Sequence, residues 1–202
     1  PILAAVLVVA FTTIVTMCMV DGITKKSVAA MLGTVIGVVF SGAFALIFGQ
    51  VTSITGYNVS DIENLVYVGE MTDIKIGELL FAGILIASLG AVMDVGMSIA
   101  STLNELKEQN PQMMTKELFQ SGMNVGRDMM GTMTNTLILA FTGGSINTLV
   151  FIFAYNYEYQ QVINMYSVGI EIMQGLSSSL GVIMAVPVTS WIAAFLYSKN
   201  QK

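Results

Sequence analysis

The sequence predicts an all-α protein, a bundle of about five helices that cross a membrane. Hydrophobic residues make up 54% of the 202 residues and charged residues only 10%, whereas a soluble domain carries roughly 25% charged residues. The mean hydropathy is +0.76. Five separate apolar runs are each long enough to span a bilayer, which takes about 20 residues. These observations place residues 1–202 in a single transmembrane domain surrounded by lipid.

The five predicted spans follow one another along the whole chain. They cover about residues 2–20, 28–49, 79–100, 129–155 and 176–197. The fourth is too long for one straight span, and its Gly143-Gly144 pair predicts a kink or an end at that point. The fifth ends with Trp191 and Tyr197, an aromatic pair typical of a membrane interface. Pro187 inside this span predicts a kink.

The connections between the spans carry most of the charged residues. Residues 50–78 mix apolar and acidic positions, so we expect them to lie on the membrane surface or to fold partly back. Residues 101–128 are interrupted near Pro111, and positions 113–123 have the pattern of an amphipathic helix. Residues 156–175 are amphipathic as well. The chain begins inside apolar sequence, so we expect further residues to precede it.

The distribution of lysine and arginine predicts the orientation. Seven basic residues lie in zones that five spans place on one side of the membrane. These are Lys25, Lys26, Lys107, Lys116, Arg127, Lys199 and Lys202. Only Lys75 falls on the other side. Because basic residues collect in cytoplasmic loops, we expect residues 21–27, 101–127 and 198–202, and with them the C-terminus, in the cytoplasm.

Asp94 is the leading candidate for a functional residue. It lies inside the apolar run 79–100, where an ionisable side chain is costly and by default functional. Ser98 and Glu105 follow it at helical spacing on the same face, and we expect Glu105 to be a solvated helix end. The alternative interpretation is structural, with the charge and the hydroxyls holding helices together.

A second polar stripe opens the fourth span. Its members are Asp128, Thr132, Asn135 and Thr136. Arg127 lies one residue before the stripe, about 100° round the helix. Because neither polar stripe suits lipid, we expect the two to face each other, with Asp94 against the turn from Thr132 to Thr136. A buried carboxylate stays charged beside an arginine and binds a proton more readily without one, which suits a proton relay. The alternative is a structural salt bridge.

Composition argues against several other classes of function. The sequence has no histidine and a single cysteine, Cys18, so a disulfide framework within the chain and a zinc or haem site are not expected. We expect no metal and no cofactor. No nucleophile–base pair and no phosphate-binding loop is visible, so an enzyme is not expected either. The few basic residues do not form a surface for nucleic acid.

The stretches around both stripes resemble the YibE/YibF family of bacterial multi-pass membrane proteins. The resemblance rests on residues 90–106 and 121–140, on the Glu171-Ile pair and on residues 181–189. It covers about half of the chain. It implies a protein of the bacterial cytoplasmic (inner) membrane that works as a homo-oligomer or with a sister YibE/YibF-type subunit.

A more distant resemblance is to SecD and SecF, RND-type proteins that use the proton gradient to assist secretion. Asp94 stands where those proteins have an aspartate in a membrane helix, and Glu105 falls on the glutamate of the following helix end. Arg127 lies within one position of the arginine that precedes the threonines of SecF. Gly96 stands where SecD has asparagine, and the arginines of the helix end are missing. The resemblance implies one RND/SecDF-like half without its first helix and without a large outer domain.

These observations together predict a proton-driven transporter or a subunit that assists secretion. Asp94 would bind the proton and Arg127 would be its charge partner, while Thr132, Asn135 and Thr136 would line a hydrogen-bonded path. The alternative is a non-transporting membrane scaffold or accessory subunit whose buried charges are structural. A partner chain with the same aspartate and arginine motifs would favour the first prediction.

Overall fold

The chain folds entirely into helices where its structure is described. The structure is a computed structural model, and it describes residues 1–59, 62–72 and 74–198. The elements are α1 (Ile2–Asp21), α2 (Lys25–Thr52), α3 (Ile62–Met71), the short 3-10 turn η1 (Ile76–Glu78), α4 (Leu79–Gln109), α5 (Thr115–Gly144), α6 (Ile146–Ala154), α7 (Tyr159–Ile163) and α8 (Tyr166–Ser198). No strand occurs in this part of the chain, so the predicted all-α class is confirmed.

The described helices supply four or five candidate membrane spans, where the sequence predicts about five. Four are long and apolar enough to cross a membrane, namely α1, α2, α8 and the stretch Ile76–Gln109 that joins η1 to α4. The fifth candidate is α5 together with α6, which meet at a bend of 55°. The result is four spans, or five if the bent pair is one span, in agreement with a polytopic helical bundle.

Most helices extend beyond the apolar runs that predicted them. We expected one span to end near residue 100, but α4 continues to Gln109, and α8 begins at Tyr166 rather than near residue 176. Hydropathy marks only the part of a helix suited to lipid, whereas the backbone hydrogen bonds continue into polar sequence. The chain leaves α4 only next to Pro111, as the sequence predicts. By contrast, α8 continues through Pro187.

The fourth span and the amphipathic segment before it form one helix. Because α5 begins at Thr115, the connection predicted over residues 101–128 shrinks to residues 110–114. Arg127 therefore lies inside α5, about 18 Å along the helix axis from Thr115, and not in a cytoplasmic connection as we expected. The polar residues occupy one face of α5, which lowers its hydropathy without interrupting its backbone hydrogen bonds.

The break predicted at Gly143-Gly144 is confirmed. α5 ends at Gly144, and α6 begins two residues later at Ile146. Glycine favours such a break because it costs about 1 kcal/mol relative to alanine inside a helix. Ser145 completes the end of α5, since its backbone N–H and its hydroxyl both donate to the Phe141 carbonyl oxygen, each at 3.0 Å.

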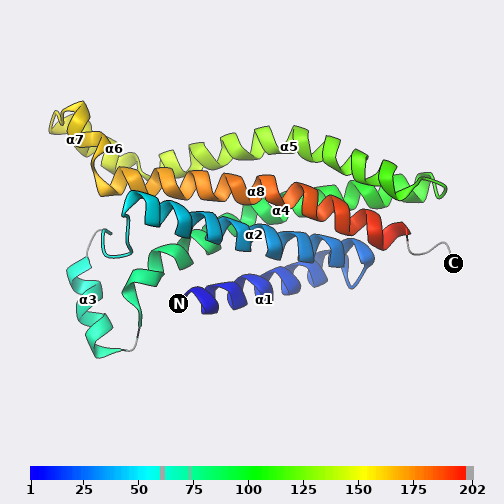
Figure 1. The fold of residues 1–202 in the computed structure, drawn as a ribbon, viewed down its shortest axis with the longest axis horizontal. Helices are drawn as coiled ribbons and strands as arrows, with labels where there is room; N and C mark the ends of the chain where they lie inside the picture. The colour runs from blue at the N-terminus through cyan, green and yellow to red at the C-terminus, as the bar shows by residue number, and fades with distance from the viewer. Residues whose placement is uncertain (60–61, 73, 199–202) are drawn as a thin grey trace.

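α8 lies at the centre of the bundle. It packs against α2, α4 and α5, while α1 covers α2 and α4 from one side, and the long helices run side by side (Figure 1). Glycine allows the closest approaches. A Cβ on Gly37 of α2 would lie 2.7 Å from Val92 Cγ1 and 2.8 Å from Ala185 Cβ, so three helices meet where no larger residue fits.

Because the three helices are so close at Gly37, we expect a single added methyl group there to change the stability strongly. We expect Gly37→Ala to lower the free energy of unfolding by roughly 1–3 kcal/mol, because overpacking a tight core shifts the backbone. Gly83→Ala is the matched control, since a Cβ there meets nothing within 4 Å. Thermal unfolding in detergent measures both variants. Equal unfolding temperatures would contradict this packing of α2, α4 and α8.

Two basic zones of the sequence, the α1–α2 turn and the α4–α5 connection, lie beside the end of α8 at one end of the bundle (Figure 1). Lys25 Nζ donates to the Leu196 carbonyl oxygen at 3.5 Å, which ties the α1–α2 turn to the end of α8. Thr115 Oγ1 donates to Ser198 Oγ at 2.6 Å, which ties the start of α5 to the same place. Lys199 and Lys202 lie outside the described residues. The short helices α3, α6 and α7 lie at the opposite end (Figure 1).

The predicted sidedness can be tested by labelling. In a Cys18→Ala background, we expect cysteines at positions 70 and 108 to react with a membrane-impermeant maleimide from opposite sides of the membrane. Both native glutamates are exposed, Glu70 on α3 and Glu108 near the end of α4. Labelling from the same side would contradict an odd number of spans between them.

Candidate functional site

Asp94 lies in the middle of α4 and points away from the bundle. Its neighbours Val92, Val95 and Gly96 are buried against the other helices. Asp94 itself is exposed, because it lies about 200° round the helix from Val92. The same outer face carries Ser98, Ser101 and Glu105, of which Ser98 is half-buried and the other two are exposed. The polar residues of α4 therefore share one face, as predicted, but this face points away from the other helices of the chain.

The polar residues of α5 are also on the outside. Arg127, Asp128, Thr132, Asn135 and Thr136 are all exposed. The helix turns its small and apolar residues inwards, and a Cβ on Gly126 would lie 2.2–3.1 Å from side chains of α8 and α4. Close packing against α8 leaves no room for the charged residues on the inner face of α5.

The two polar faces lie at the same depth in the bundle. A Cβ on Gly122 would lie 3.0 Å from Leu103 Cδ1, and one on Gly126 would lie 3.1 Å from Ile99 Cδ1. These contacts set an antiparallel register between α4 and α5. When the same register is extended along the two helices, Asp94 lies level with Gly131. In this register Arg127 lies about 6 Å further along the axis.

The expected contacts between the two faces are not present within the chain. Among the described residues, the ion pairs between side chains are those of Lys26 with Asp21 and of Lys75 with Glu78, so neither Asp94 nor Arg127 belongs to one. The expectation that the two stripes face each other inside one chain is therefore wrong. Both helices fill the core with their small and apolar faces, and this turns the polar faces outward.

The Thr136 hydroxyl has its hydrogen-bond partner on its own helix. Thr136 Oγ1 donates to the Thr132 carbonyl oxygen at 2.9 Å, so its lone pairs remain free to accept a hydrogen bond. Asp94, Arg127 and Asn135 take part in no side-chain hydrogen bond in the described part of the structure. The outer faces of α4 and α5 thus leave the Asp94 carboxylate, the Arg127 guanidinium and the Asn135 amide accessible to a partner outside the chain.

A second set of polar residues, which we did not predict, lies inside the bundle. Seven buried hydroxyls make no hydrogen bond within the described residues: Thr34 and Ser41 of α2, and Ser177, Ser178, Ser179, Thr189 and Ser190 of α8. A Cβ on Gly96 would lie 3.0 Å from Thr34 Oγ1 and 3.6 Å from Thr189 Oγ1. Since Gly96 follows Asp94 by two residues, this polar pair lies across α4 from it. The Ser177-Ser178-Ser179 run in an apolar span is the sequence signal.

Thr34 and Thr189 give the core a polar character near the level of Asp94. A buried hydroxyl without a partner is unfavourable and is commonly satisfied by ordered water. Their position between α2 and α8 also lets the two helices approach closely, because serine and threonine are small. The interior of the bundle therefore carries neutral hydroxyls, whereas the charged side chains of α4 and α5 lie on the outside.

Comparison with known proteins places the whole bundle in one family. A family model described as YibE/F-like protein matches residues 1–199. The match includes both polar faces, the break between α5 and α6, and all of α8. No curated protein and no solved structure matches the chain.

Proposed function

The chain belongs to the YibE/F-like protein family, and from this membership we propose that it couples proton movement to transport, or to the assistance of secretion, across the bacterial cytoplasmic membrane. Its apolar helices make it a multi-pass membrane protein. The observation that carries the proposal is Asp94, a carboxylate at mid-span with no ion pair among the described residues.

The environment of Asp94 favours a proton carrier over a fixed salt bridge. A charge at bilayer depth is retained only where it serves a purpose or has a partner. A structural salt bridge needs its partner within about 4 Å, and none of the described side chains provides one for Asp94. A carboxylate without a fixed partner can take up a proton from one side of the membrane and release it to the other.

The other polar residues have roles that follow from their position. Arg127, about 6 Å along the axis from the level of Asp94, favours the charged carboxylate when the two helices shift relative to each other. Thr132, Asn135 and Thr136 offer hydrogen-bonding groups along the same face. Together they form a path by which water or a proton reaches Asp94.

The outward direction of this face also supports a partner chain. A polar face exposed to lipid is unfavourable, so in the membrane we expect a second copy of the chain or a sister YibE/YibF-type subunit to cover it. The small residues Gly83, Ala87 and Gly90 lie on this face and are exposed, which allows another helix to approach closely. The C-terminus would lie in the cytoplasm with the basic end of the bundle.

A non-transporting scaffold or accessory subunit is the alternative, favoured by the same small residues. In that case Asp94 and Arg127 would pair with charges of the partner and hold the two chains together. Proton flux into proteoliposomes, measured for the wild type and for Asp94→Asn, separates the two functions. Flux that depends on Asp94 supports the carrier, and wild-type flux equal to that of empty liposomes leaves the scaffold.

A further inference from the structure

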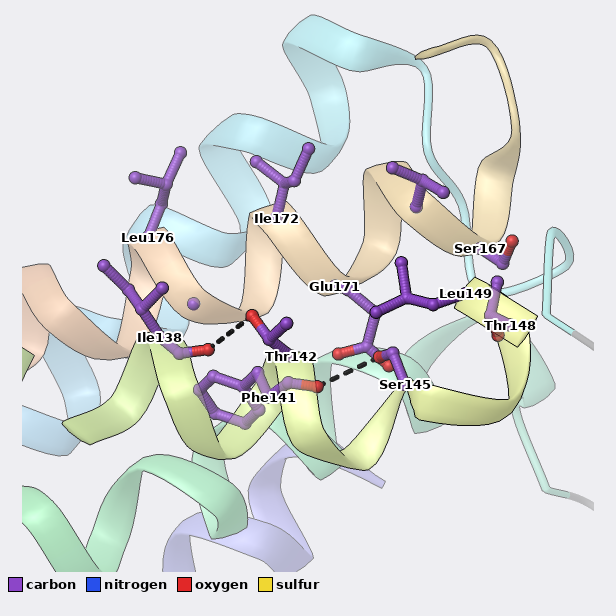
Figure 2. Close-up of a pocket in the computed structure, with 12 residues that line it drawn as sticks. Ile138, Phe141, Thr142, Ser145, Thr148, Leu149, Ser167, Glu171, Ile172 and Leu176 are labelled. Carbon is purple, nitrogen blue, oxygen red and sulfur yellow. Dashed lines mark hydrogen bonds between the residues drawn. The ribbon is translucent and has the colours of Figure 1, made fainter. Parts of the chain in front are cut away.

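A pocket with a volume of about 330 Å³ opens where α5 breaks away from the bundle (Figure 2). It lies between the end of α5, the start of α6 and the first half of α8, at the end of the bundle opposite the basic zones. Its apolar side chains include Ile138, Leu149, Ile172 and Leu176, which are between 44% and 58% exposed. In a bilayer this rim meets lipid, so an apolar molecule can enter the pocket from the membrane.

Glu171 is the ionisable residue of this pocket. It is half-buried on α8, and its side chain points across the pocket toward Ser145 (Figure 2). In the described part of the chain it makes neither an ion pair nor a side-chain hydrogen bond. The one described lysine outside the basic zones, Lys75, already pairs with Glu78 at 3.6 Å. A cation beside the carboxylate offsets the cost of holding its charge among apolar side chains.

The hydroxyls beside Glu171 also favour a ligand that donates hydrogen bonds. Thr142 Oγ1 donates to the Ile138 carbonyl oxygen at 2.7 Å, and Ser145 Oγ donates to the Phe141 carbonyl oxygen at 3.0 Å (Figure 2). Because both hydroxyl hydrogens are engaged, the oxygens face the pocket as acceptors. The C-terminal end of α5, which borders the pocket, adds the partial negative charge of a helix terminus.

We propose that this pocket binds a protonated amine that carries an apolar body, with the ammonium group on Glu171 and the hydroxyls of Thr142 and Ser145. Each N–H of the ammonium finds an acceptor there, and the apolar body lies among the side chains that face lipid. The inference deepens the proposed transport function by naming a class of substrate, and it rests on that function only in this respect. A free hydrophobic amine and the ethanolamine headgroup of a lipid share this chemistry.

Equilibrium dialysis without a proton gradient tests the binding itself. The purified chain in phosphatidylcholine nanodiscs should bind hexylammonium in preference to uncharged hexanol. Glu171→Gln should weaken the binding of hexylammonium at least tenfold. Glu158→Gln should leave it unchanged, because Glu158 is an exposed carboxylate near the same end of the bundle that does not line the pocket. Equal binding of hexanol, or undiminished binding by Glu171→Gln, would overturn the proposal.

A second variant tests the pocket without changing its charge. Ile172→Trp should fill the pocket and weaken binding as well, and since Ile172 is 58% exposed, the fold should tolerate the change. Phosphatidylethanolamine added to the nanodiscs identifies the source of the amine. Competition with hexylammonium supports a lipid headgroup, and binding without competition supports a free amine. Absent binding with intact proton flux would reject the pocket and leave the proposed function standing, whereas binding without flux would do the reverse.

Discussion

Asp94→Asn should reduce proton flux in proteoliposomes to the level of empty liposomes while the protein remains folded and abundant. Asparagine keeps the size of the side chain but cannot bind and release a proton. The fold should survive because Asp94 is exposed on α4 and makes no ion pair with the described residues. A pH-sensitive dye inside the vesicles measures the flux, and thermal unfolding in detergent measures the stability.

Glu105→Gln is the matched control for this variant. Glu105 lies on the same face of α4 but near its end, where it accepts a hydrogen bond from Gln109 Nε2 at 2.9 Å. Its charge is solvated, so its removal should leave the flux unchanged. Full flux in Asp94→Asn would end the proton-relay proposal. A loss of abundance without any wild-type flux would support the scaffold, because removing one partner of a buried pair costs about 3–5 kcal/mol.

A cysteine at position 90 should cross-link two chains in the membrane, the second large effect that we expect. Gly90 lies one helical turn before Asp94 on the outer face of α4, and a Cβ there meets nothing within 4 Å. If a second copy of the chain packs on this face about a two-fold axis near Gly90, the two cysteines approach within the 4.4–6.8 Å between Cα atoms that a disulfide requires. Oxidation in a Cys18→Ala background should convert most of the protein into a covalent dimer.

The matched control for the cross-link is a cysteine at position 39. Val39 of α2 is 46% exposed, but its face carries no charge and needs no partner in lipid. We expect no dimer from Val39→Cys. A product between Gly90→Cys and a different chain, seen in cells but not with the pure protein, would identify a sister subunit. Absence of any product from Gly90→Cys would contradict a symmetric dimer that packs through this face at Gly90.

Much of the architecture followed from local properties of the chain. Hydropathy alone identified the helices that suit a bilayer, because lipid selects for long runs of apolar side chains. The break after Gly144 could be predicted as well, since two adjacent glycines weaken any helix. Asp94 stood out for the same kind of reason, as a carboxylate inside an apolar run. Each of these inferences depends on residues that are neighbours in the sequence.

The ends of the helices were predicted less well. The polar residues of α5 suggested a connection as far as residue 128, but the helix already begins at Thr115. The pattern of residues 113–123 predicts an amphipathic helix, but mean hydropathy does not show that this helix continues into the next span. The backbone hydrogen bonds decide the matter, and they continue wherever no residue breaks them. Arg127 was therefore assigned to the wrong environment.

Only the tertiary structure decided which way the polar faces point. The sequence shows two polar stripes on neighbouring helices. Because polar side chains are unfavourable in lipid, we expected the two stripes to face each other. Close packing prevails instead, because Gly37 and Gly126 let α2 and α5 approach their neighbours with little space between the helices. This packing turns Asp94 outward. The Glu171 pocket likewise depends on the bend between α5 and α6 over α8. Such outcomes depend on contacts between distant segments, which local hydropathy does not contain.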